Sequence, residues 1–411
     1  MIQEPLFPHV GVCALVPDSW AETWQPRHYV LEKLARYFHV VWVNPACEWR
    51  EIFRDLARQN SYDTNTLRPP GLIIYAPEFW LPVFYRPQWL ARFTFDTRLK
   101  HARRLLTSRG CRKIIIYLWR PGFMPALASI PYDLSCYHVD DEYSFSEVEV
   151  PPDPVEMAVL AKVDQVFIHS PELLERKGHI NRNTTFVPNG VEYQLYAEAV
   201  EEPEDLSGIP HPRIGYTGYI KKQLDWCLIQ KLANQHREWS FVFVGPRSPH
   251  PEITGIIDEL SSYPNVYFLG PKSVRDLAAY PQHFDTCIMP YCVDAYTNNI
   301  YPLKLHEYLA SGRPVVSVPI RSLRDFVKVV ALADGVDEWS KALTRSLEPV
   351  ASCPHGVAAR RKIAREYDWD KLVHLIAQTL CERLGSEYVQ QFNEIASRDY
   401  GVNHTLHNFI D

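Results

Sequence analysis

The hydrophobic pattern of the chain alternates between short runs rich in Val and Ile and longer segments with apolar residues at helical spacing. Such alternation predicts parallel sheets covered by helices, because strands buried on both sides have no polar face. The pattern lapses in an acidic, proline-bearing stretch from about 197 to 212 and then restarts. The expected strands are 9–17, 39–45, 71–77, 113–119, 133–139, 164–170 and 184–190, then 213–220, 240–246, 265–271, 285–291 and 313–319.

This alternation indicates an α/β fold of two Rossmann-like, doubly wound domains. A length of 411 residues suits two domains of about 150–200 residues each. Such sheets bind ligands outside the carboxyl ends of their strands, so we expect a cleft where the two domains face each other. The expected parts are a first domain at 1–198, a linker at 199–212, a second domain at 213–365, and a C-terminal helix and tail at 366–411 that could return to the first domain.

Composition excludes some classes of protein. The net charge of −6 gives no general attraction for nucleic acid, and nine cysteines without a CxxC pair are typical of reduced thiols in a cytoplasmic protein. The start MIQEPLFPHV lacks the features of a signal peptide, and no apolar run reaches the roughly 18 residues that span a bilayer. We therefore expect a cytoplasmic protein, with peripheral contact at the inner membrane face as an option.

The stretch NNIYPLKLHEYLASGRPVVS, residues 298–317, predicts a helix start with candidate binding chemistry. Pro302 suits the first turn, where a missing N–H costs little. The amides of Leu303, Lys304 and Leu305 would then point at a phosphate, which the positive end of a helix attracts. Glu307, one turn further on, could accept hydrogen bonds from ribose hydroxyls. A helix packed on a strand, with Glu307 solvated, is the other interpretation.

The stretch CYHVDDEYSF places one histidine and three acids at the end of an expected strand. His138, Asp140 and Asp141 would lie near the cleft, as acceptor ligands or as a general base. A metal site at the two aspartates is conceivable, and a plain turn cap is the alternative. His169, which ends the next strand, fits a satisfied strand-end histidine.

Two basic regions are candidates for the acceptor or membrane side. Arg27 and His28 begin the first helix after a loop with Trp20 and Trp24, and would face the cleft or simply lie on a helix surface. Residues 86–113 hold nine Arg or Lys and one Asp, a net charge of +8. Aromatic and basic residues together suit an anionic membrane surface, although a solvated helix face explains them too. Phe95, Leu99, Ala102 and Leu106 should pack inward, with Arg98, Lys100, Arg103 and Arg104 outward near Trp89 and Phe93.

The ordered set of motifs resembles a known family. IGYTGYI, FVFVGP, NVYFLGPKSVRDLAAY, FDTCIMPY and PLKLHEYLASGRPVVS are similar to the nucleotide-sugar domain of GT-B glycosyltransferases, in particular the retaining family-four group. RHYVLEKLAR, VVWVNP, YLWRPGF, CYHVDDEYSF, VFIHSPELL and VPNGVE resemble a subgroup acting on bacterial envelope polysaccharides. The resemblance covers roughly residues 9–380.

The resemblance assigns roles to particular residues. Glu307 matches the second Glu of a Glu-x7-Glu motif, which holds ribose, while the first Glu is replaced by Asn299 beside Asn298. Lys222 takes the place of the Lys that stabilises the departing diphosphate, with Lys221 next to it. Gly218 would let the backbone approach the phosphates. The turn Gly270-Pro271-Lys272 would hold the base through main-chain contacts.

The implied function is transfer of a sugar from a nucleotide sugar, with UDP-sugars favoured, to a glycan or lipid-linked acceptor with retention. The resemblance implies no resident cofactor or metal, and no nucleic-acid partner. Asn299 keeps open a non-catalytic subunit that binds a glycan or nucleotide. The paired aspartates keep open a sugar-nucleotide epimerase.

Overall fold

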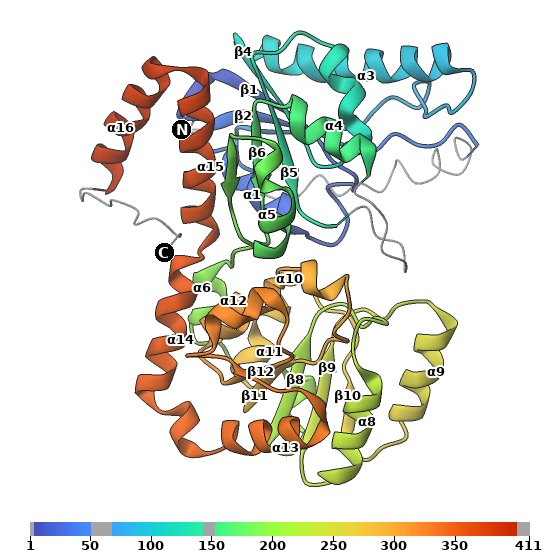
Figure 1. Cartoon of the computed structure of the whole chain (residues 1–411), viewed down its shortest axis with the longest axis vertical. Coiled ribbons are helices and arrows are strands. Elements are labelled where there is room, and N and C mark those ends of the chain that lie inside the picture. The colour runs from blue at the N-terminus through green and yellow to red at the C-terminus, as the bar shows by residue number, and fades with distance from the viewer. Residues whose placement is uncertain (1–3, 51–67, 143–152, 401–411) are drawn as a thin grey trace.

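The computed structural model describes residues 4–50, 68–142 and 153–400, and it contains two parallel β-sheets, one above the other in Figure 1. The first sheet has the strand order β3-β2-β1-β4-β5-β6-β7 and the second β10-β9-β8-β11-β12-β13. Their strands are β1 Phe7–Leu15, β2 Phe38–Val43, β3 Leu72–Tyr75, β4 Lys113–Leu118, β5 Leu134–Val139, β6 Gln165–Ile168 and β7 Thr184–Phe186, then β8 Arg213–Thr217, β9 Ser240–Val244, β10 Val266–Phe268, β11 Thr286–Met289, β12 Val315–Ser317 and β13 Ala331–Leu332.

Both sheets are doubly wound, as the sequence pattern predicts. In each of them the strand order reverses beside its first strand, at β1/β4 in one sheet and at β8/β11 in the other. Ligands bind at such reversals in open α/β sheets. The helices are α1 Pro26–Leu34, α3 Gln88–Ser108, α4 Pro154–Lys162, α5 Pro171–Lys177, α6 Tyr193–Ala197, α7 Glu204–Ser207, α8 Trp226–Gln235, α9 Pro251–Leu260, α10 Val274–Leu277, α11 Ala279–Gln282, α12 Leu303–Ser311, α13 Gly335–Ser346, α14 Pro354–Glu366, α15 Trp369–Leu384 and α16 Ser386–Tyr400.

Alternate residues of β1 serve two hydrophobic layers, because successive side chains of a strand point to opposite faces. Val12 and Ala14 pack in the layer that contains α1 and α15, while Cys13 and Leu15 pack with α3 and α4. Leu99, Ala102 and Leu106 of α3 are buried there and Phe95 packs against them, so the inward face of α3 is as the helical spacing predicts. None of the helices formed by the described residues has the length and apolar character needed to cross a bilayer.

The chain crosses between the domains earlier than the expected linker at 199–212. Val191, Tyr193 and Tyr196 already belong to the core of the second domain, and so do Leu206 and Ile209 within that stretch. The acidic, proline-bearing stretch is therefore a surface segment that is attached to the second domain by two buried residues, Leu206 and Ile209. At the other end, α15 packs along α1 and supplies the first domain's core, so the C-terminal segment lies beside that domain (Figure 1). Residues 401–411 of the expected tail lie outside the described part of the chain.

Candidate functional site

Helix α12 begins at Leu303 with Pro302 as its N-cap, and no side chain caps this end. The Leu305 amide donates to the Pro302 carbonyl at 3.2 Å, so it is not available to a ligand as the sequence interpretation had it. Among the described residues, the amides of Leu303 and Lys304 have no acceptor. Two such amides at the positive end of a helix attract an anion.

The Lys304 side chain lies over the end of β8. Its Nζ is 5.0 Å from the centre of the Tyr216 ring, and it hydrogen-bonds with Tyr291 at the end of β11. Gly218 makes room for it, because a Cβ on Gly218 would lie 2.7 Å from Lys304 Nζ. The φ of +118° at Gly218 is also one that residues with a side chain rarely adopt. Gly218 was expected to let the backbone approach the phosphates. In the structure it lets the Lys304 side chain approach the backbone at the reversal of strand order.

Lys221 is the second cation at this place, and Lys222 is not. Lys221 is half-buried, and its pKa is lowered by burial and then by the nearby charge of Lys304, against an opposing influence of Asp141. Lys222 is exposed, and none of the described residues forms an ion pair with it. The sequence interpretation gave Lys222 the catalytic place, whereas in the structure Lys221 is the lysine near Lys304.

Glu307 is half-buried where α12 meets α6 and α1. Tyr196 of α6 donates a hydrogen bond to its carboxylate. Burial raises the pKa of Glu307, while the charge of Lys304 and the bond from Tyr196 lower it. Burial and then the Glu307 charge raise the pKa of Tyr29, which belongs to the first domain. Glu307 thus lies between the domains, and the alternative of a solvated surface Glu is wrong.

Asn299 joins the two domains instead of presenting its amide to a ligand. It is buried; its Oδ1 accepts from Arg176 Nη1 of α5 at 3.1 Å, and its Nδ2 donates to the Ala295 carbonyl at 2.5 Å. Each end of the amide thus has a protein partner in this conformation, and the expected contact of Asn299 with the donor sugar stays a prediction. Asn298 beside it is half-buried, and its backbone amide bonds the Asp294 carbonyl at 3.1 Å.

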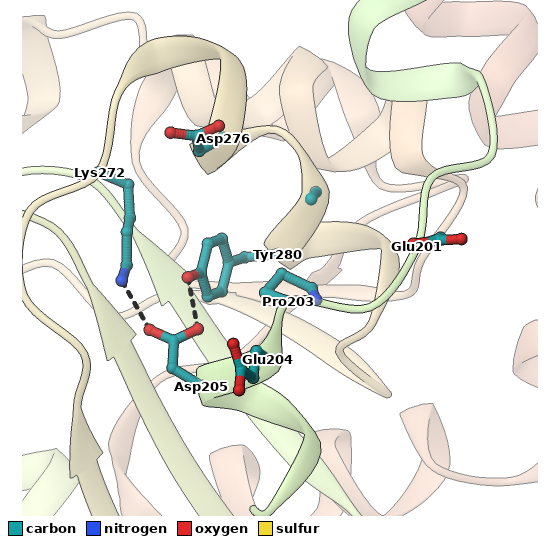
Figure 2. Close-up of a pocket in the computed structure, with 8 residues that line it drawn as sticks. Glu201, Pro203, Glu204, Asp205, Lys272, Asp276 and Tyr280 are labelled. Carbon is teal, nitrogen blue, oxygen red and sulfur yellow. Dashed lines mark hydrogen bonds and ion pairs between the residues drawn. The ribbon is translucent and has the colours of Figure 1, made fainter.

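The turn expected to hold the base follows β10. Gly270 has a φ of +73° and its carbonyl accepts from the Gly245 amide at 2.9 Å, while Pro271 is exposed. The Lys272 amine pairs with Asp205 at 2.6 Å, and Tyr280 donates to the same carboxylate at 2.7 Å. Figure 2 shows this arrangement in an open pocket. The other charged residues of the wall, Glu201, Glu204 and Asp276, are acidic, so this pocket does not suit a pyrophosphate.

Asp140 is fixed by two arginines. Its Oδ2 accepts from Arg27 Nη1 at 2.5 Å and its Oδ1 from Arg120 Nη1 at 2.8 Å. Arg27 is buried and also pairs with Asp18. Both oxygens accept from arginines, so Asp140 holds these two side chains in place, and its expected role as a base or acceptor ligand stays a prediction. Arg27 ties the start of α1 to the end of β5.

Asp141 is the carboxylate of this stretch that faces the second domain. It is half-buried, its Oδ1 accepts from the Glu142 amide at 2.8 Å, and burial raises its pKa. Its charge acts on Lys221 and Tyr296 of the second domain and on His169 at the end of β6. Residues 143–145 of the same motif lie outside the described part of the chain.

Two histidines that were expected near the cleft belong to the core. His138 of β5 is buried, its Nδ1 is 2.9 Å from the Tyr117 hydroxyl, and its ring stacks on Trp119; burial lowers its pKa well below the usual value. His28 is enclosed by Trp20, Trp24 and Trp42, and its Nδ1 accepts from the Gln25 amide at 3.0 Å. Burial and the charge of Arg27 lower the pKa of His28 to about 4. Both predictions were wrong.

The basic face expected on α3 is only partly basic and exposed. Lys100 and Arg104 are exposed, Arg103 is half-buried, and Arg98 is buried. Arg98 Nη1 donates to the carbonyls of Leu81 and Pro82 at 2.6 and 3.0 Å, so it organises a loop.

Sequence reasoning missed Arg120 and the tyrosines near the start of α12 and near Asp141. Arg120 lies two residues after β4 at the reversal of strand order, and this position was the available signal. Tyr196, Tyr291 and Tyr296 come from loops and short helices that no periodic pattern marks.

Part of the chain is similar to a known family. Residues 211–348 match the profile of the family described as Glycosyl transferases group 1. TuaH of Bacillus subtilis (strain 168), by its name a teichuronic acid biosynthesis glycosyltransferase, is 32% identical over 201 residues, which cover 46% of this chain and 49% of that protein. The chain thus spans about half the length of that relative.

Two solved structures share the architecture. One, titled trehalose-6-phosphate from E. coli bound with UDP-2-fluoro glucose, has a TM-score of 0.65 at 12% identity and covers 91% of this chain and 99% of that one. The other, a mutant of S. aureus TarM with fondaparinux, alpha-GlcNAc-glycerol and UDP, has a TM-score of 0.60 at 11% identity and covers 92% and 100%. The chain therefore has the GT-B fold. The match to the group 1 glycosyltransferase family lies within its residues 211–348.

Proposed function

We propose that the chain is a glycosyltransferase that moves a sugar from a nucleotide-sugar donor to a glycan or lipid-linked acceptor during synthesis of a cell-envelope polysaccharide. One observation carries the proposal: the two available amides of α12, Lys304 and Lys221 converge at the strand reversal, one turn from Glu307. A UDP-sugar is favoured because one structural neighbour is bound with UDP-2-fluoro glucose and the other is in complex with UDP. The name of TuaH supports an envelope polysaccharide as the product.

The donor fits this geometry in one orientation. The amides of Leu303 and Lys304 bind the diphosphate, and the Lys304 amine neutralises part of its charge. The Glu307 carboxylate accepts hydrogen bonds from the ribose hydroxyls. Lys221 acts on the leaving diphosphate, whose negative charge grows as the glycosidic bond breaks, so its contribution is largest in the transition state.

The acceptor lies on the first domain's side. The acceptor hydroxyl attacks the anomeric carbon from the face that the diphosphate leaves, which retains the configuration, and its proton passes to a diphosphate oxygen. Asp141, which faces Lys221, accepts a hydrogen bond from the incoming acceptor. The pair Arg176–Asn299 links the domains beside this place and holds them closed around the substrates.

A donor panel tests the proposal. The protein is heated with UDP, GDP and their sugars, and the sugar nucleotide that raises Tm most is then followed by mass spectrometry. Slow release of UDP, accelerated by an acceptor that gains the sugar, is the expected result. Stabilisation without turnover would instead identify a binding subunit, as the engaged Asn299 amide allows, and interconversion of the sugar would identify an epimerase.

A further inference from the structure

The exposed aromatic side chains are concentrated in one segment of the first domain. Among the described residues, all the large exposed aromatics except Tyr219 lie between Trp49 and Phe93. Trp89 is 71% exposed and Phe93 and Trp80 are each 60% exposed. Aromatic residues concentrated in this way on a protein surface mark a site of interaction. The members are Trp49, Phe79, Trp80, Tyr85, Trp89 and Phe93.

The outer face of α3 combines two of these aromatics with two cations. At 100° per residue, Trp89, Phe93, Lys100 and Arg104 fall within an arc of about 60°. The α3 stripe, as we name these four residues, is aromatic in the first turns of the helix and basic in the later ones. All four are exposed, and none of the described residues forms an ion pair with either cation.

The loop before α3 is built to display its aromatic residues. Arg98 is buried, and it uses its Nη1 on the carbonyls of Leu81 and Pro82. Glu78 accepts from the Tyr75 hydroxyl at 2.7 Å and lies 2.9 Å from His101 Nδ1. These contacts fix the loop at both ends of the pair Phe79-Trp80, whose rings meet edge to face at 5.0 Å. Burying a guanidinium is costly. The buried Arg98 guanidinium fixes the residues that follow Phe79 and Trp80, whose rings are exposed to solvent.

The chemistry of this region selects one kind of partner. Tryptophan and phenylalanine insert at the boundary between headgroups and acyl chains, while Lys and Arg are attracted by anionic lipid. The segment 86–113, which is α3 with its flanking residues, carries a net charge of +8 in a chain whose total is −6, so the positive charge is concentrated in and around α3. A neutral or cationic partner would not use it.

The geometry points to the α3 stripe as the surface by which the protein docks on an anionic lipid bilayer. The helix lies in the plane of the interface, with Trp89 and Phe93 inserted and Lys100 and Arg104 at the headgroups. This surface does not include any residue of the donor site, so docking and donor binding are separable.

Co-sedimentation of the full chain with vesicles tests the proposal. The vesicles contain phosphatidylcholine with about 30% phosphatidylglycerol, or phosphatidylcholine alone, at an ionic strength of about 0.1 M. The wild type should bind the anionic vesicles and lose most binding on the neutral ones. Lys100→Gln with Arg104→Gln should lower partitioning about 30-fold and flatten its salt dependence. Trp89→Ser with Phe93→Ser should lower it about tenfold and leave the salt dependence in place.

Two matched control variants remove the same kinds of side chain, basic or apolar, from surfaces outside α3. Lys341→Gln with Arg345→Gln removes an exposed basic pair at the same spacing from α13, and Val327→Ser with Val350→Ser removes two exposed apolar side chains. Both should partition like the wild type. Equal losses in the controls, no binding of the wild type to anionic vesicles, or a dimer that Trp89→Ser and Phe93→Ser dissociate would each overturn the proposal.

UDP affinity, measured on the same variants, separates this proposal from the proposed function. It should stay within about twofold of the wild type, because the α3 stripe lies outside the donor site. Loss of UDP binding in the stripe variants would contradict that separation. A wild type that binds vesicles but not UDP would contradict the donor site alone.

Discussion

The edges at which the two domains face each other differ in how their charges are satisfied. At the first domain's edge, Asp140 is held by two arginines and the buried Lys177 by Glu142 and Glu156. At the second domain's edge, neither Lys221 nor Lys304 forms an ion pair with any described residue. Side chains in ion pairs hold loops in place, whereas cations without an ion pair, beside two available amides, suit an anionic ligand. Of each adjacent pair in the sequence, Asp140-Asp141 and Lys221-Lys222, the proposed site therefore uses one member.

The largest effect expected from this contrast is a loss of stability at Asp140. Asp140→Ala leaves the buried Arg27 without one of its partners, which should cost about 3–5 kcal/mol of unfolding free energy. Denaturation in urea measures this loss, and UDP affinity of the folded fraction should be unchanged. A stable Asp140→Ala variant that binds UDP but has lost turnover would make Asp140 catalytic after all.

The next effect separates two neighbouring lysines. Lys221→Met should lower turnover of the donor about 10²–10³-fold, because one group that stabilises charge in the transition state is removed. Lys222→Met, which changes an exposed neighbour, should stay within about twofold. Release of UDP under saturating donor gives both values. A large loss of turnover in Lys222→Met with little change in Lys221→Met would support Lys222 as the lysine that acts on the diphosphate, as the sequence interpretation had it.

Acid should destabilise the first domain through His28. The unfolded chain binds a proton at this residue below about pH 6.5, but the folded protein only below about pH 4. The unfolding free energy should therefore fall by up to about 3 kcal/mol as the pH drops from 6.5 to 4, and stay level above 6.5 for this group. His28→Phe should flatten the dependence of Tm on pH in that window. An unchanged slope would mean that His28 is accessible to solvent.

The smallest effect expected concerns Glu307. Its pKa is raised mainly by burial, so its ionised form costs folding energy above that pKa, and the cost disappears as the pH falls below it. Glu307→Gln should raise Tm of the ligand-free protein by a few degrees at neutral pH and not at acidic pH. It should also weaken UDP binding about tenfold, through loss of the ribose contact. Undiminished UDP affinity would remove Glu307 from the donor site.

The fold was largely predictable because buried parallel strands leave a strong apolar signal. The misses have physical causes. Strand β13 has two residues, Ala331–Leu332, too few to form a pattern. His138 was placed at the cleft, although a residue inside a strand covered on both faces must be buried whichever way it points. The linker was predicted from composition at 199–212. The chain already enters the core of the second domain at the buried Val191, before that stretch.

The candidate site was only partly predictable. The start of α12 follows from Pro302 and the apolar helix behind it, and Glu307 then falls one turn inside. The sequence does not show which of Lys221 and Lys222 lies at the site. Both lie in a turn, where no periodic pattern predicts the direction of a side chain. The hydrogen bond from Arg176 to Asn299 was also not predictable. It joins residues of two domains, and the hydrophobic pattern of the sequence gives no information on contacts between domains.

The central claim is that Lys221 and Lys304, with the start of α12, form the site for the diphosphate of the donor. Calorimetric titration with UDP, which has no sugar to transfer, tests it without any assumption about the acceptor. The double variant Lys221→Met, Lys304→Met should bind UDP about 100-fold more weakly than the wild type, and Lys222→Met should bind within about twofold of it. Full affinity in the double variant, or a comparable loss in Lys222→Met, would contradict the account.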